Sequence, residues 1–163
     1  MYEVNDIVLY NRTDVCRVHE IRRMACLGEY SDYYMLKPVY EDSQANSVVY
    51  VPVDADESRI RRAFSAEELR AMLTVTSHRV PWLDSPLIRK KEYTDLLGRS
   101  VPSELIGLIR TLSERREEQS RAGRKFSDAD EKYLVAAQKK LFPLFKYILN
   151  VEWEEFLNVV AAK

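Results

Sequence analysis

The spacing of apolar residues changes partway along this chain, and that change constrains the fold more than any other feature. Up to about residue 64, short runs of β-branched and aromatic residues at 6–10, 15–21, 32–39 and 47–53 are separated by polar turns. From Ser65 onward, apolar residues recur at helical spacing. The sequence therefore predicts an α+β protein in which a small antiparallel β-barrel precedes an all-helical region.

Turn and capping residues set the expected boundaries of these elements. A short fifth strand is expected near 59–62, and helices are expected over 66–73, 87–97 and 102–118. Ser65 begins a capping-box pattern, and Ser127 is expected to cap a fourth helix, which Pro143 should end or kink. Asn150 is expected to cap a last short helix. We therefore expect a β domain at 1–64, a connecting helix at 65–76 and a helical domain at 77–163.

The segment at 77–86, between the two patterns, carries the most informative side chain. Trp82 lies between Pro81 and Pro86, and the cations Arg89, Lys90 and Lys91 follow. A large aromatic residue in such a segment is poorly placed for a regular core and well placed to contact a partner. Because Trp is highly buried on average, packing of Trp82 at a seam between two domains is the alternative interpretation.

Charge is unevenly distributed, although the net charge is only −1. Before residue 76, thirteen acids exceed nine bases, whereas sixteen bases exceed thirteen acids from residue 76 onward. The excess is densest at 79–125, with eleven bases and seven acids. This bias favours an anionic partner for the second half, although mixed charge runs are also usual on solvated helix faces.

Several classes of chemistry lack the residues that they need. The four glycines are isolated, so the chain has neither a P-loop nor a dinucleotide fingerprint. His19 and His78 lie in no recognisable nucleophile or metal constellation, and Cys16 and Cys26 are expected to be small buried hydrophobes. We therefore expect a binding function that uses no metal and no cofactor. One alternative is an enzyme in which the fold brings two carboxylates together as an acid–base pair.

The sequence also bears on location. No apolar run approaches the roughly 20 residues that span a bilayer, and the first residues do not resemble a signal peptide. We expect a cytoplasmic protein without a membrane partner. The sequence does not define its oligomeric state.

Four segments occur in an order found in one bacterial family. They are 2–10 (YEVNDIVLY), 32–36 (DYYML) with 49–52 (VYVP), Trp82 with 105–112 (LIGLIRTL), and 123–127 (GRKFS) with 130–134 (DEKYL). With these segments the chain resembles the CarD-like transcription regulators, whose N-terminal domain is shared with transcription-repair coupling factor. The resemblance covers nearly the whole chain, although no single segment is specific.

The resemblance implies a fold, two partners and a set of site residues. It implies a Tudor-like (SH3-like) barrel that binds the β subunit lobe of RNA polymerase, and a helical domain that contacts promoter DNA without reading its sequence. Trp82 matches the family tryptophan that inserts at the upstream edge of the opening bubble, an action that would stabilise the open complex. The expected DNA contacts, apart from Trp82, are all cations: Arg79, Arg89, Lys90, Lys91, Arg124, Lys125 and Lys132.

Some positions depart from the family pattern. A family glycine is replaced by Asn5, which tolerates a left-handed backbone, and Met24 and Tyr50 stand where well-known members place polymerase-contacting arginines. Arg22 and Arg23 lie near Met24 as substitutes, and the strand edge at 49–52 can pair with the lobe by strand addition. The expected polymerase contacts are therefore Arg22, Arg23, Met24, Val49, Tyr50, Val51 and Pro52. An adaptor that binds polymerase and makes no DNA contact is the remaining alternative.

Overall fold

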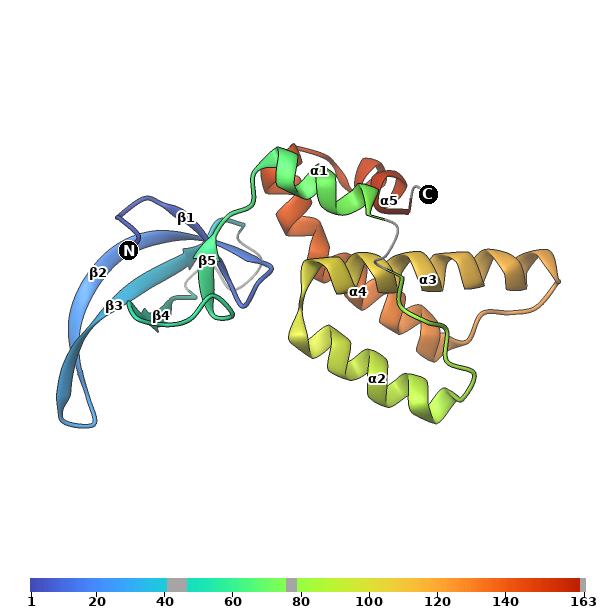
Figure 1. Ribbon diagram of the computed structural model, residues 1–163, viewed down its shortest axis with the longest axis horizontal. Helices are drawn as coiled ribbons and strands as arrows, with labels where there is room; N and C mark the ends of the chain where they lie inside the picture. The colour runs from blue at the N-terminus through green and yellow to red at the C-terminus, as the bar shows by residue number, and fades with distance from the viewer. Residues whose placement is uncertain (41–46, 76–78, 162–163) are drawn as a thin grey trace. The chain divides into compact units, whose positions relative to one another are not determined.

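The chain folds as two compact units, Met1–Ala63 and Phe64–Lys163. The computed structural model describes residues 1–40, 47–75 and 79–161. Within these residues the first unit contains a five-stranded antiparallel sheet and the second contains five helices (Figure 1). The predicted α+β class is confirmed. The expected loop at 40–46 and the junction at 76–78 fall largely outside the described residues.

The sheet of the first unit has the order β4-β3-β2-β1-β5, so β4 and β5 form its two edges. Its strands are β1 (Ile7–Tyr10), β2 (Asp14–Cys26), β3 (Glu29–Pro38), β4 (Val49–Pro52) and β5 (Ile60–Arg62). Alternate side chains point to one face and form the core, which contains Val8, Cys16, Val18, Tyr34, Leu36, Val51 and Ile60. Burial of this face follows from the period-two pattern of the sequence.

Strands β2 and β3 extend beyond the predicted lengths as a long curved hairpin, and its turn lies away from β1, β4 and β5 (Figure 1). Cys26 pairs with Glu29 across a two-residue turn, in which Leu27 has φ 52° and Gly28 has φ 85°. Two positive φ angles are typical of a type I′ turn, which matches the twist of the strands. Leu27 is fully exposed at this turn.

The two cysteines differ in environment. Cys16 is buried in the sheet core, where desolvation, with a smaller effect from Asp14, raises the pKa of its thiol to about 12. Cys26 is exposed, because it lies at the end of the hairpin and beyond the core. The prediction that both cysteines are buried is therefore wrong for Cys26.

Asn5 has φ 76°, in the left-handed region where asparagine is tolerated. Its N–H donates to the carbonyl of Val18 at 2.7 Å. Asn5 therefore adopts the left-handed backbone conformation that was expected where the family has a glycine.

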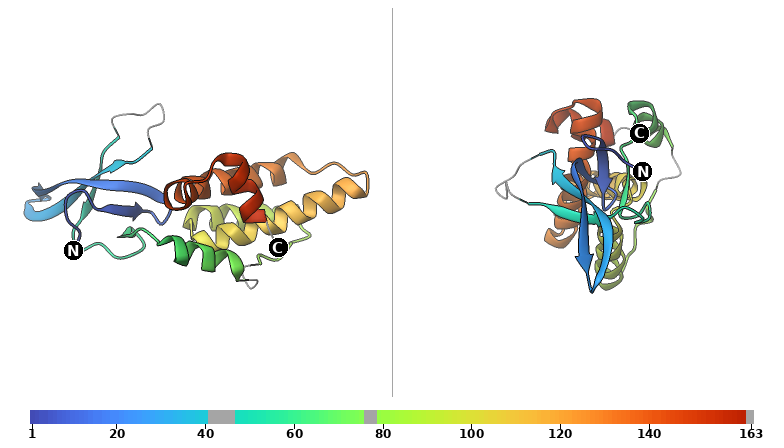
Figure 2. Two further views of the ribbon diagram at one scale, coloured as in Figure 1. Left: turned by 90° about the horizontal axis from the view of Figure 1, so that it is seen from above. Right: turned by 90° about the vertical axis from the view of Figure 1, so that its left-hand side faces the viewer.

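The helices of the second unit pack around the two longest, α3 and α4, which run antiparallel (Figures 1 and 2). The helices are α1 (Ala66–Thr74), α2 (Pro86–Arg99), α3 (Pro102–Arg121), α4 (Asp128–Leu149) and α5 (Trp153–Ala161). Ser65, Ser85 and Ser127 cap α1, α2 and α4 by accepting a hydrogen bond from a backbone N–H of the first turn. The predicted caps at Ser65 and Ser127 are confirmed.

Arg110 on α3 ties two other helices together. Its guanidinium donates to the carbonyl of Leu73 at 2.6 Å and to that of Val160 at 3.1 Å, near the ends of α1 and α5. Desolvation, and secondarily Arg79, lowers the pKa of Arg110. Helix α1 also packs on α4 and belongs to the second unit.

The structure bears on the two helix boundaries predicted at Pro143 and Asn150. Pro143 was expected to end or kink the fourth helix; α4 does not end there but continues to Leu149, because buried Leu141, Leu144 and Phe145 on either side of the proline hold both halves in the core. Asn150 does not begin the last helix. It ends α4, with φ 53°, because asparagine readily adopts the left-handed conformation of a C-cap.

Candidate functional site

Trp82 lies in the second unit, in the segment that precedes α2. It is partly buried, and the guanidinium carbon atoms of Arg89 and Arg115 lie 4.3 Å and 4.8 Å from its ring centroid. Both distances are within the range of a cation–π interaction. The indole is thus held against α2 and α3 and is neither fully buried nor fully exposed.

The backbone on both sides of Trp82 is held by side chains of these two helices. The hydroxyl of Thr111 on α3 donates to the carbonyl of Val80, and that of Tyr93 on α2 donates to the carbonyl of Pro81 at 3.0 Å. Burial raises the pKa of Tyr93 above its ordinary value. We refer to residues 80–84 as the Trp82 loop.

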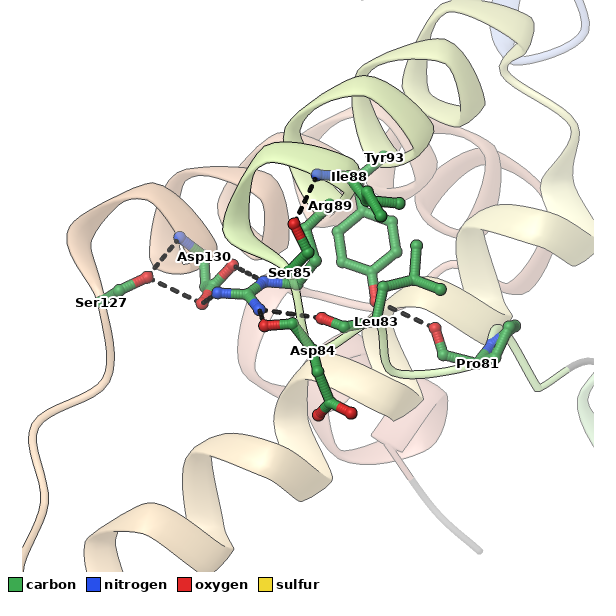
Figure 3. Close-up of polar contacts among 9 residues, drawn as sticks. All are labelled: Pro81, Leu83, Asp84, Ser85, Ile88, Arg89, Tyr93, Ser127 and Asp130. Carbon is green, nitrogen blue, oxygen red and sulfur yellow. Dashed lines mark hydrogen bonds and ion pairs between the residues drawn. The ribbon is translucent and has the colours of Figure 1, made fainter.

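Arg89 holds the other end of the Trp82 loop. It donates to the carbonyls of Leu83 and Asp84 at 2.8 Å and 3.1 Å, and to both carboxylate oxygens of Asp130 at 3.0 Å and 3.2 Å (Figure 3). The side chains of Arg89 and Asp130 are only 10% and 4% exposed. Ser127 also donates to Asp130, at 2.7 Å, and joins the start of α4 to this network.

These contacts correct the expectation that Arg89 binds a phosphate. The Arg89 guanidinium is buried, and it already donates hydrogen bonds to one carboxylate and two backbone carbonyls. It is therefore not available to bind an external anion. Its place in the sequence, next to Lys90 and Lys91, gave no sign of this, because Asp130 lies 41 positions away.

A groove of about 380 Å³ adjoins Trp82. The two cations that line the groove are paired with carboxylates: Arg79 with Glu114 at 3.1 Å, and Arg115 with Glu118 at 3.4 Å. The groove is lined by Arg79, Val80, Pro81, Trp82, Thr111, Glu114, Arg115 and Glu118. Its rim therefore carries both signs of charge.

The remaining predicted DNA contacts are exposed. They lie on α2, after α3 and on α4, and they are Lys90, Lys91, Arg124, Lys125 and Lys132. Lys125 is 3.6 Å from Asp128, but both side chains are more than 80% exposed, so solvent weakens the pair. The Arg89–Asp130 pair brings the start of α2 to the start of α4 and therefore brings these cations into one region of the second unit.

In the first unit, strand register divides the predicted polymerase contacts between the two faces of the sheet. Arg22 pairs with Tyr33 and Tyr33 with Pro52, while Glu20 pairs with Met35 and Met35 with Tyr50. Paired residues share a face, which also carries Met24. We call this set the outer face: Glu20, Arg22, Met24, Tyr33, Met35, Tyr50 and Pro52. Val49 and Val51 lie on the opposite face with the core, as Arg23 does on the extended hairpin.

The outer face is largely apolar and partly exposed. Tyr50 is 37% exposed, and Met24, Tyr33, Met35 and Pro52 are partly exposed. Its two charged residues pair with each other, since Arg22 donates to both carboxylate oxygens of Glu20 at 3.1 Å and 2.9 Å. This hydrogen bonding lowers the pKa of Glu20 and raises that of Arg22.

The edge strand β4 also offers backbone groups. The N–H of Val53 donates to the carbonyl of Asp32 at 3.1 Å, so by antiparallel alternation Val51 and Val49 bond to β3. The N–H and C=O of Tyr50 then point away from β3. Pro52 lacks an N–H and is suited to an edge. A partner strand could therefore pair at Tyr50 without displacing β3.

Sequence reasoning missed Tyr33 and Met35 as members of the outer face. The two residues are two positions apart in one predicted strand, and this spacing indicates that they share a face of the sheet. Sequence reasoning also missed Tyr93, Thr111 and Arg115, for which the sequence offers no local signal. The described residues contain no cluster of three or more His, Cys, Asp or Glu side chains suited to a metal ion. No helix among them has the length and apolar character needed to cross a bilayer.

The first unit is a five-stranded antiparallel sheet with a largely apolar, partly exposed outer face, and a comparison of sequences relates it to a known domain family. Residues 2–63 match the family described as the CarD-like/TRCF RID domain, so the first unit is similar to the domains of this family. Domains of this family bind RNA polymerase through its β subunit and are not a known enzyme family. A search of curated proteins found no match for the chain.

Proposed function

We propose that this chain is a bacterial transcription regulator that binds RNA polymerase through its first unit and stabilises the promoter open complex through its second. The family match supports the polymerase contact. The observation that best supports the proposed DNA contact is the geometry of the Trp82 loop, in which a partly exposed indole is held beside a groove.

The outer face and the β4 edge together form the proposed surface for the polymerase β subunit. Met24 and Tyr50 lie on the outer face with Arg22, so the surface offers apolar and aromatic contacts where related proteins use arginine. Tyrosine suits this role, because it buries a large area and keeps a polar group for hydrogen bonding. The backbone of Tyr50 adds strand pairing at the same place.

Trp82 is the proposed wedge at the upstream edge of the bubble. An apolar side chain placed at an unstacked base step lowers the free energy of distorted DNA relative to closed duplex. The exposed cations Lys90, Lys91, Arg124, Lys125 and Lys132 are the proposed phosphate contacts, which position the protein without reading sequence. Arg79 is a weaker candidate because it is paired with Glu114, and Arg89 is removed from this set.

The test is the lifetime of the open complex formed by bacterial RNA polymerase on a promoter, with the wild-type chain and with Trp82→Ala. We expect the variant to remain folded, to bind polymerase normally and to lose most of the increase in lifetime. Leu87→Ala is the control, because Leu87 is an apolar residue of the same region that is 78% exposed. Unfolding of Trp82→Ala at a cost of about 3–5 kcal/mol would instead support the packing role.

One observation favours the adaptor as a second candidate. The two arginines that contact the indole, Arg89 and Arg115, and Arg79 in the adjoining groove are all paired with carboxylates, so the immediate surround of the indole is close to neutral. An adaptor would bind polymerase but not bubble DNA at any salt concentration. For a DNA-binding regulator, the logarithm of the binding constant would fall linearly with the logarithm of the salt concentration. The double variant Lys90→Gln/Lys91→Gln would reduce the magnitude of that slope by about 2.

A further inference from the structure

Four backbone carbonyls of the Trp82 loop are bound by side chains. Those of Val80, Pro81, Leu83 and Asp84 all accept hydrogen bonds from α2 or α3, and Trp82 stands in the middle. Carbonyls of a surface loop are ordinarily bonded to water or to nearby backbone. An arrangement that uses three side chains for one short loop fixes the position of the residue at its centre.

The donors to the Trp82 loop are themselves fixed. Tyr93 is 1% exposed and packs edge-on against Tyr133, at a centroid distance of 5.9 Å. Arg89 is held by Asp130, which in turn accepts from Ser127 (Figure 3). The chain of contacts therefore leads from the loop into the buried faces of α2 and α4.

We propose that Arg89, Tyr93 and Thr111 are positioning residues that hold Trp82 in one orientation as a rigid wedge. The inference rests on the proposed function of the Trp82 loop and adds a mechanism to it. An indole inserted at an unstacked step is pressed by bases that tend to restack, and a mobile side chain would be displaced. A side chain ordered in the free protein also loses less conformational entropy on binding.

The order of Trp82 can be measured without any partner. The chain has two tryptophans, so Trp153→Phe leaves Trp82 as the single indole. In this background, Tyr93→Phe and Thr111→Val remove only the hydrogen bonds to the loop. Tyr147→Phe and Ser113→Ala are matched controls on α4 and α3. Tyr93→Phe alone serves if the double variant does not fold.

Time-resolved fluorescence anisotropy should show fast local motion of Trp82 in the Tyr93→Phe/Thr111→Val variant and little in the controls. The same variant should shorten the lifetime of the open complex by about five- to 150-fold, as expected for the loss of two neutral hydrogen bonds that act on the wedge, and by no more than Trp82→Ala does. Its affinity for polymerase should be unchanged. Unchanged anisotropy of Trp82 would overturn the positioning role.

The open-complex measurement separates this inference from the proposed function. If Trp82→Ala shortens the lifetime but the variant with a mobile Trp82 does not, the wedge stands and the positioning role is overturned. If Trp82 becomes mobile while neither variant changes the lifetime, the hydrogen bonds do order the indole but the proposed function fails, and the positioning role in DNA binding fails with it.

Discussion

The two units place their candidate surfaces by different means. In Met1–Ala63, strand alternation and register alone bring Arg22, Tyr33 and Pro52 to one face. In Phe64–Lys163, the Trp82 loop has no regular structure and depends for its shape on side chains up to 31 positions away. A surface built on a sheet tolerates many side chains, whereas a loop held by a few contacts is sensitive to each of them.

Asp130→Ala should have the largest effect and would show how far the Trp82 loop depends on one buried pair. Removal of the carboxylate leaves the Arg89 charge buried and unpaired, which costs about 3–5 kcal/mol. Urea denaturation measures the loss. Asp128→Ala is the control, since Asp128 is 85% exposed and should change the free energy of unfolding by less than about 0.5 kcal/mol. Equal effects of the two variants would show that the buried pair is not essential.

Alkaline pH should weaken the first unit through Cys16. Its thiol has a pKa of about 12 when folded and 9.0 as its ordinary value. Both states hold the proton below pH 9, so the full stability is present there. Between pH 9 and 12 the unfolded state releases the proton first, and the free energy of unfolding falls by up to about 1.4 kcal/mol per pH unit.

The control for this effect is Cys16→Ala, which should lack that part of the decline. Cys26 is exposed and should react with a thiol reagent in the native protein, whereas Cys16 should react only after unfolding. Rapid labelling of both cysteines at neutral pH would contradict the burial of Cys16.

Tyr50→Ala tests whether the outer face binds polymerase. A buried tyrosine at an interface contributes about 1–3 kcal/mol, so affinity should fall by roughly five- to 150-fold. Tyr30→Ala is the matched control, because Tyr30 is 69% exposed on the same sheet but lies on the opposite face. A pull-down or titration with RNA polymerase measures both, and an equal loss would remove the distinction between the faces.

Leu27→Asn should have the smallest effect and should be stabilising. Leu27 is fully exposed with φ 52°, so asparagine relieves backbone strain of about 1 kcal/mol without loss of buried area. Urea denaturation of the full chain measures the gain in the first unit. A decrease in stability would show that Leu27 makes a contact that outweighs the strain.

The sequence predicted the strands, most of the helices and the exposed cations, because period and capping are local properties. The resemblance also led us to expect a left-handed backbone at Asn5, which its φ of 76° confirms. The sequence left open whether α4 ends at Pro143 or continues through it, because the packing of the surrounding residues decides that outcome. The role of Arg89 was equally inaccessible, since a buried ion pair exists only once α2 and α4 have been brought together.

The most direct test of the account is photo-crosslinking from position 82 in the open complex. A benzophenone amino acid in place of Trp82 would react with the nearest C–H bonds on irradiation. The account predicts crosslinks to promoter DNA at the upstream edge of the bubble, and none to that DNA when the same group replaces Tyr147. Crosslinks from position 82 only within the chain or to polymerase would contradict the proposed wedge.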